Sequence, residues 1–248
     1  MASTPASSSP VAVRLRLARL RDLGTLVHLY RHRSERSWAF YHPFPADRLR
    51  LTIIFAWLIL TRRWVGSLMR RIPGWCGVVV VALLPGSPKP IGYGTVRPEV
   101  DTDGEMVAKF GFLVEDHLQN RGIGKQIMIA QAYVTRELGI RKAHGTIIAG
   151  NVPSRRTAER FGWRIWATNR PDLHAPGQPN MEAAVDLEEI FRRVGDPTRI
   201  PPGALPGRVT DQSLGPTDRA VDPVGEAHAL GPSERAKPVI ARDQRGTP

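Results

Sequence analysis

The stretch 114–125, Val-Glu-Asp-His-Leu-Gln-Asn-Arg-Gly-Ile-Gly-Lys, has the residue types and spacing of an anion-binding site. An apolar run over 110–114 leads into a polar turn, and Gly122 and Gly124 open a segment with helical periodicity. A strand that passes through such a turn into a helix presents free N–H groups at the positive end of the helix dipole. Because glycine has no Cβ, a phosphate or pyrophosphate can approach this backbone closely. The same pattern also fits a tight strand-to-helix connection that binds no ligand.

The elements around this turn alternate between strand and helix patterns. Three β-branched or alternating segments joined by short turns predict an antiparallel meander directly before the glycine turn. A helix, a strand, a short helix and two closing strands are expected after it. The predicted strands are 11–17, 78–84, 91–96, 105–114, 143–149, 163–168 and 182–187, and the helices around the turn are 123–138 and 153–161.

Two aspartates mark the expected starts of two earlier helices. Asp22 and Asp47 each precede an apolar periodic segment, the usual place of an N-cap. The second helix is apolar nearly all round over 51–60 and is flanked by arginines. It is either a buried helix beside a binding groove or a helix on a membrane surface, with arginines reaching the headgroups. At about 1.5 Å per residue the apolar run covers roughly half of a bilayer core, so no integral span is expected.

Charge and cysteine content limit the class of protein. The net charge is +12, and residues 1–72 hold thirteen arginines against three acidic residues. This basic front suits an acidic partner, nucleic acid or an anionic membrane, although a general preference for arginine over lysine explains it equally well. Cys76 is the single cysteine, and the N-terminus lacks a basic secretion signal. We therefore expect a cytoplasmic protein with no intrachain disulfide.

The domain organisation is read from composition. Residues 1–10 are rich in Ser, Ala and Pro, and residues 195–248 are rich in Pro and Gly with few aromatic side chains. Such segments bury too little apolar surface to offset their ordering entropy, so we expect disordered ends around one domain over 11–194. His28 and His32 lie one helical turn apart, but no third ligand is evident, and no metal site is predicted.

The order of elements and three short motifs resemble the GNAT superfamily of N-acetyltransferases. The motifs are Gln119-x-x-Gly122-x-Gly124, then Asn151-x-x-Ser154, then Phe161-Gly162-Trp163. The resemblance covers roughly 11–190 and implies an α/β fold, with a mixed, mostly antiparallel, splayed sheet flanked by helices. It also implies acetyl-CoA as the cosubstrate, without a metal.

The resemblance assigns the coenzyme to particular residues. The pyrophosphate would bind the amides of the turn, and the pantetheine arm would pair with the strand backbone near Leu113 and Val114. Asn151 would help to hold the arm. The turn residues are Gln119, Asn120, Arg121, Gly122, Ile123, Gly124 and Lys125.

The groups that usually transfer protons in this family are absent. Ala158 occupies the position of the common Tyr acid, and Lys109 that of the common Glu base. Ser154 could instead donate a proton to the leaving thiolate, and Glu105 could act as a base through water. Ser154 could equally serve the start of its helix, and Glu105 could be a solvated turn residue.

The sequence therefore predicts direct acetyl transfer from acetyl-CoA to a primary amine on a protein or a small molecule. A catalytically degenerate coenzyme-binding or regulatory module is the first alternative, because of Ala158 and Lys109. A basic adaptor for nucleic acid or a membrane surface is the second. Of these two partners, nucleic acid is the less favoured, and association with a membrane surface stays open. The sequence does not indicate an oligomeric state.

Overall fold

The computed structural model describes residues 11–40, 44, 47–68, 71, 73–171 and 179–194. The ends at 1–10 and 195–248, where disorder is expected, lie outside these residues. The strands within them are β1 (Arg14–Leu17), β2 (Val78–Leu83), β3 (Pro90–Val100), β4 (Met106–Val114), β5 (Lys142–Ile148), β6 (Arg164–Pro171) and β7 (Pro179–Asp186). The α-helices are α1 (Leu23–Arg31), α2 (Glu35–Phe40), α3 (Arg48–Thr61), α4 (Val65–Leu68), α5 (Ile123–Glu137), α6 (Val152–Arg160) and α7 (Leu187–Val194). The short 3₁₀ turns are η1 (Leu20–Asp22), η2 (Arg62–Trp64) and η3 (Asp116–Leu118).

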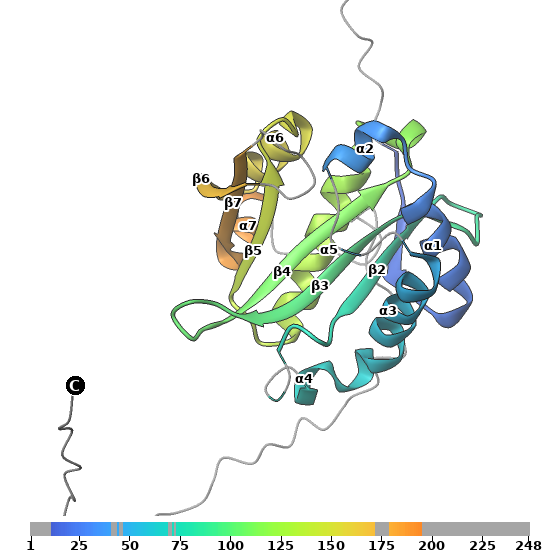
Figure 1. Ribbon diagram of the computed structural model, residues 1–248, viewed down its shortest axis with the longest axis horizontal. Coiled ribbons are helices and arrows are strands. Elements are labelled where there is room, and N and C mark those ends of the chain that lie inside the picture. Colours follow the sequence, from blue (N-terminus) through green and yellow to red (C-terminus); the bar gives the residue numbers. More distant parts are fainter. Residues whose placement is uncertain are drawn as a thin grey trace, which may run out of the picture. The chain divides into compact units, whose positions relative to one another are not determined.

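The described strands form one sheet in the order β1-β2-β3-β4-β5-β7-β6. Neighbouring strands are antiparallel except β4 and β5, which run parallel. These two strands pair over three positions only, from Val107 opposite Lys142 to Lys109 opposite His144. Beyond that point they diverge toward the end where α6 begins (Figure 1). The expected mixed, mostly antiparallel, splayed sheet is confirmed.

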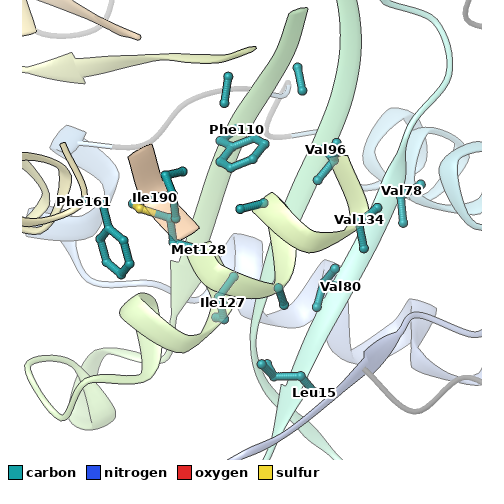
Figure 2. Packing of buried hydrophobic residues seen from close by; sticks show 14 of the residues in the cluster. Leu15, Val78, Val80, Val96, Phe110, Ile127, Met128, Val134, Phe161 and Ile190 are labelled. Atoms are coloured by element: carbon teal, nitrogen blue, oxygen red, sulfur yellow. The ribbon is translucent and has the colours of Figure 1, made fainter. Parts of the chain in front are cut away.

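One face of the sheet packs against α5 and α7. The apolar side chains of α5 recur with helical spacing, so that Ile123, Ile127 and Val134 point into the same layer. They meet alternate residues of the strands, among them Val80 and Phe110. Figure 2 shows side chains from the strands, α5 and α7 gathered in this layer.

The other face packs against α1 and α3. Tyr30 of α1 and Phe55 of α3 are fully buried, and Phe55 meets the ring of Tyr93 on β3 edge-on, with centroids 5.3 Å apart. Leu113 of β4 belongs to the same cluster. This cluster fixes which side chains of β3 and β4 face α1 and α3, because the side chains of a strand alternate.

The two predicted N-caps differ in what they bind. Asp47 caps α3 as expected, since its Oδ1 accepts from the N–H of Arg50 at 2.8 Å. Asp22 does precede α1, but its carboxylate makes no capping bond there. It accepts instead from the Arg16 guanidinium at 2.6 and 2.8 Å and from the N–H of Arg19 at 2.7 Å. Asp22 is therefore the N-cap residue of α1 by position, as predicted, but its carboxylate binds the buried Arg16 and the N–H of Arg19 and not the first amides of the helix.

Candidate active site

The turn between β4 and α5 has the geometry of an anion cradle. Asn120 and Gly122 both have left-handed backbone conformations, with φ of 61° and 77°. Gly122 is the N-cap of α5, and the amides that follow it point out of the helix start, as the first amides of any helix do. Successive amides in such a turn converge on one point and favour a negatively charged ligand. The predicted strand–turn–helix connection is present, and the pyrophosphate site at Gly122, Ile123, Gly124 and Lys125 stays a prediction that this backbone suits.

Gly124 is required for the close approach of α5 to β4. A Cβ at this position would lie 2.9 Å from Cε2 of Phe112, closer than real Cβ contacts come. The ring of Phe112 therefore fills the place of a side chain, and the helix start lies directly over the end of β4. A larger residue would displace the amides that form the cradle.

The side chain of Gln119 forms hydrogen bonds within the protein. Its Nε2 lies 3.1 Å from the carbonyl oxygen of Val114, 2.8 Å from Oδ1 of Asp116 and 3.0 Å from Oγ of Ser37. Asp116 also accepts from the Ser37 hydroxyl and, at 2.5 Å, from the N–H of Ser34. Gln119 and Asp116 therefore tie the turn to the start of α2, so Gln119 supports the cradle from behind.

Asp116 is held in its charged form by these contacts. Burial by itself would raise the pKa of this carboxyl group. The hydrogen bonds from Ser37 and Ser34 and the charge of Arg33 outweigh burial and lower the pKa below its ordinary value. The tie between α2 and the turn is therefore intact at neutral pH.

The divergence of β4 from β5 leaves one edge of β4 unpaired in the described structure. The N–H of Glu115 donates to the carbonyl oxygen of Ile91 at 2.9 Å, which sets the alternation of the β3–β4 ladder. Phe112 and Val114 consequently turn their N–H and C=O groups away from β3, toward the opening. Beside this edge Trp163 lies against Phe110, with ring centroids 5.8 Å apart, and its indole N–H is buried without a partner among the described residues.

This edge fits the amide-containing pantetheine arm of a coenzyme A thioester. An extended ligand with amide groups can pair with an open strand edge as a further strand would. The same edge ends on the N-terminal amides of α5, which suit the pyrophosphate. The backbone N–H and C=O groups of Leu113 point to β3. Of the predicted pair Leu113 and Val114, only Val114 therefore has backbone groups that face the opening.

Asn151 and Ser154 lie together at the start of α6. Oδ1 of Asn151 accepts from the N–H of Ser154 at 3.2 Å, so Asn151 caps this helix. Ser154 is partly exposed, whereas Ala158, one turn later, is buried. Ser154 thus lies in the first turn of α6, the helix that follows β5.

Glu105 lies at the other end of β4 from the cradle. It is exposed and forms an ion pair with Lys142 at the start of β5. Nine residues at about 3.3 Å each, or roughly 30 Å of strand, separate it from Val114. The structure therefore does not bring Glu105 together with Ser154 or with the turn.

A cluster that the sequence did not predict lies where β4 and β5 part. Glu99 of β3 has its Oε2 3.3 Å from Nε2 of His144 and 3.9 Å from Nζ of Lys109. Its Oε1 lies 3.2 Å from Arg97. Tyr93 and Leu113 pack on the α1/α3 face of the sheet. Because every second side chain of a strand lies on the same face, the cluster also lies on this face, opposite α5. Only the register of three strands joins these residues, and the sequence does not reveal that register.

Glu99 also stays charged. Burial would raise the pKa of its carboxyl group, but the contact with His144 and the charges of Lys109 and Arg97 outweigh burial and lower the pKa. A carboxylate with a lowered pKa is a weak proton acceptor at neutral pH, and a neighbouring imidazole is better matched to that task. Glu99 is thus suited to orient His144.

A hollow of about 230 Å³ opens on the α1/α3 face beside the end of β4. It reaches the first residues of the turn that leads from β4 to α5. Its lining includes basic and acidic side chains as well as the backbone of the strand end. The lining residues are His28, Leu29, His32, Arg33, Leu113, Val114, Glu115, Asp116 and His117.

Comparisons with solved structures agree with this architecture. An N-acetyltransferase from Staphylococcus aureus Mu50 is 15% identical over 71% of this chain and 98% of its own, with a TM-score of 0.53. A phosphinothricin acetyltransferase from Sinorhizobium meliloti, in complex with acetyl-CoA, is 17% identical over 71% and 89%, with a TM-score of 0.55. RimL, a ribosomal alpha-N-protein acetyltransferase in complex with coenzyme A, is 13% identical over 74% and 98%, with a TM-score of 0.56.

At these identities the solved structures support the fold alone, and the expectation of acetyl-CoA agrees with the complexes among them. A search of curated proteins finds no matching relative. The profile of the family described as "Acetyltransferase (GNAT) domain" matches residues 12–164, more than half of the chain. The resemblance inferred from the sequence is thereby confirmed, and the chain belongs to the GNAT family of acetyltransferases.

Proposed function

We propose that this protein transfers an acetyl group from acetyl-CoA directly to a primary amine. The observation that carries the proposal is the unpaired edge of β4, which faces the opening and ends on the amides of the α5 cradle. The pyrophosphate would bind the amides of Gly122 to Lys125, and the pantetheine arm would pair with the backbone of Phe112 and Val114. Asn120 and Arg121 would border the phosphates, with Gln119 and Asn151 holding the walls of the site.

The acceptor would approach from the α1/α3 face. The thioester would lie in the opening between β4 and β5, and that face carries the charged side chains nearest to the point where the strands part. Glu182 of β7 lies on the same face, since it is opposite Thr146 and Thr146 is two residues from His144. Its carboxylate would favour a positively charged amine, whether on a protein or on a small molecule.

An alkyl amine is mostly protonated at neutral pH, so it must lose a proton before it attacks the thioester. We assign this task to His144, directly or through a water molecule, with Glu99 positioning the imidazole. As the amine nitrogen bonds to the carbonyl carbon, the carbonyl oxygen gains negative charge, which N–H groups of the open β4 edge would stabilise. The sequence-based candidate Glu105 remains a competing hypothesis, and its ion pair with Lys142 weighs against it.

The bond between the carbonyl carbon and sulfur then breaks, and the thiolate needs a proton. We assign the role of general acid to Ser154, which lies at the start of α6, one turn before the buried Ala158. Its hydroxyl could pass a proton to the sulfur and recover one from solvent. No covalent acyl-enzyme is needed, so Cys76, which is buried, has no part in the reaction.

A second candidate function is coenzyme binding without turnover. Ala158 is buried and Lys109 is engaged with Glu99, so neither position supplies the usual acid or base. This module would sense acetyl-CoA and bind a partner in response. It predicts full coenzyme binding and no consumption of acetyl-CoA with any amine.

The test combines binding and turnover on the full chain. Thermal unfolding is followed with increasing acetyl-CoA, and release of free thiol is then followed with peptide N-termini, lysine peptides, polyamines and aminoglycosides. We expect stabilisation by acetyl-CoA and amine-dependent thiol release, with the acetylated amine identified by mass spectrometry. Stabilisation without release supports the binding module, and the absence of stabilisation contradicts both functions.

A further inference from the structure

The helix α3 is apolar on two sides, but only one side has partners in the described fold. Leu51, Phe55 and Leu58 point into the core against α1 and the sheet. On the opposite side of α3, and in η2 directly after it, five large apolar residues are exposed by 45% to 68%. We name these the outer stripe: Leu49, Ile53, Trp57, Leu60 and Trp64.

Four residues of the outer stripe lie along α3 itself. They are spaced by four, four and three positions, so at 3.6 residues per turn they fall within an arc of roughly 80°. From Leu49 to Leu60 this part of the stripe is about 17 Å long at 1.5 Å per residue. Trp64 extends it in η2, the 3₁₀ turn that follows α3 directly. Large exposed apolar surfaces of this kind mark interaction sites.

One further exposed residue extends the stripe. Trp75 is 75% exposed, and its carbonyl oxygen accepts from the indole N–H of Trp57 at 2.5 Å. Three tryptophans therefore lie on this surface, and tryptophan is the residue that concentrates at membrane–water boundaries.

The charged side chains of the segment that carries the stripe are basic. Residues 48–75 contain no Asp or Glu, and the acidic residue just before them, Asp47, caps α3 through the N–H of Arg50. Arg48, Arg50, Arg63 and Arg71 are exposed; helical spacing puts Arg50 on one flank of the stripe, and Arg63 lies beside Trp64 in η2. Arginine side chains in these positions can extend from the apolar surface to anionic groups beside it.

We propose that the outer stripe docks this protein on the surface of a bilayer that contains anionic lipids. The apolar side chains would enter the boundary between headgroups and acyl chains, and the flanking arginines would contact the headgroups. For a cytoplasmic protein, as the sequence leads us to expect, this surface is the inner leaflet. The proposal does not depend on the proposed transferase activity.

The helix would lie on the membrane and not cross it. The segment Arg48–Leu68 has 21 residues, and its most apolar window, with a mean hydropathy of 1.3, would by length and composition allow a span. However, a third of that window is buried in the fold. Crossing a bilayer would pull Leu51, Phe55 and Leu58 out of the core, whereas surface docking leaves them in place.

A second copy of the chain is a poorer occupant. Two stripes facing each other would bring arginines against arginines, and segment 48–75 offers no carboxylate to neutralise them. Nucleic acid would neutralise the arginines but would leave the apolar stripe without a partner. An anionic bilayer satisfies both the apolar and the charged residues.

Vesicle flotation of the full chain tests the proposal. The protein is mixed with vesicles of phosphatidylcholine alone, or with about 30% phosphatidylglycerol, at low and at high salt. Three variants are compared: Ile53→Ser with Trp64→Ser in the stripe, Arg50→Gln with Arg63→Gln beside it, and the control Val100→Ser with Arg141→Gln elsewhere on the surface. All six positions are exposed, so the fold should persist, which thermal unfolding checks.

The wild type should float with the anionic vesicles and shift its tryptophan emission to the blue, and added salt should weaken this binding. The stripe and arginine variants should each lose at least about tenfold in vesicle partitioning, while the control variant keeps it. Equal flotation of the wild type and the stripe variant would overturn the proposal. So would a failure to bind anionic vesicles, or a lipid-free dimer that the stripe variant disperses.

Discussion

The two ends of the opening between β4 and β5 are built in different ways. At the wide end, the cradle uses backbone amides from one continuous stretch, 119–125, and needs mainly glycine at two positions. At the narrow end, where the strands part, a cluster of side chains comes from three strands: Glu99, Lys109 and His144. The first end is set by local backbone conformation, the second by the register of a sheet.

Because of this difference, substitutions should have different effects at the two ends. A backbone site tolerates most side chains, as long as the turn keeps its conformation and the helix can approach the strand. A side-chain site changes its chemistry with each substitution, and this chain has Ala158 and Lys109 where the resemblance leads us to expect an acid and a base. The proposed account therefore keeps the coenzyme at the backbone site and assigns proton transfer to other side chains.

The largest effect is expected at the narrow end. His144→Gln removes the proposed base, and kcat should fall by about 10²–10⁴-fold, the usual cost of losing a general base. Glu99→Gln should also lower kcat, though less, and should alter the pH profile of the rate because it acts through His144. Steady-state kinetics with the best amine measures both. The matched control is Glu105→Gln, which should leave kcat within about threefold.

If Glu105→Gln abolishes turnover and His144→Gln does not, Glu105 is the base, as the sequence suggested. The side-chain cluster at the narrow end then does not carry out the proton transfer. In either case the affinity for acetyl-CoA should be unchanged, since Glu105 and His144 both lie away from the cradle.

The next effect is expected at the cradle. Gly124→Val puts a side chain where the ring of Phe112 already lies, and the affinity for acetyl-CoA should fall by about 100-fold. Calorimetric titration measures the dissociation constant. Gly24→Ala in α1 is the control, because a Cβ there meets nothing within 4 Å, and it should bind as the wild type does. Unaltered binding by Gly124→Val would place the coenzyme elsewhere.

Ser154→Ala tests the wall of the opening between these two ends. Removal of the hydroxyl should lower kcat by about tenfold to 100-fold with little change in the KM for acetyl-CoA. The N–H of Ser154 still reaches Asn151, so α6 keeps its cap and the fold should be intact. A rise in KM alone would instead give Ser154 a binding role.

The smallest effect concerns acid stability. The pKa of Glu99 is lowered in the folded state, so its stabilising contribution is present above the ordinary pKa and is lost as the pH falls through the folded value. Between pH 6 and pH 3 the wild type should therefore lose slightly more unfolding free energy than Glu99→Gln, by about 1 kcal/mol or less. Urea unfolding at the two pH values measures this difference. An identical loss in both proteins would mean that the cluster does not hold Glu99 charged.

The same contrast explains what could be predicted from the sequence. The strands β2, β4 and β5 and the helix α5 follow from local patterns and lie within one residue of the expected bounds, whereas β3 continues to Val100, four residues past its predicted end at 96. Asp22 shows a limit, because a buried arginine six residues earlier takes the carboxylate that should cap α1. The short helices α2 and α7 were not predicted, because they span only about two turns each.

The cluster at the narrow end could not be predicted for a different reason. Glu99 and His144 are 45 positions apart, and only the pairing of β3 with β4 and of β4 with β5 brings them together. Strand register depends on the whole hydrophobic pattern and on turn geometry. Glu105 looked suitable because it shares a strand face with Lys109, but that face continues for roughly 30 Å away from the cradle.

Hydrogen exchange on the full chain tests the central claim most directly, because it reports where acetyl-CoA binds. The amides of Phe112 and Val114 and those at the start of α5 should exchange more slowly with saturating acetyl-CoA, and the β4 amides at 107–109, which lie before the strands part, should not change. This result would place the coenzyme along the open edge of β4, as proposed. Protection elsewhere, or none at saturating acetyl-CoA, would contradict the account.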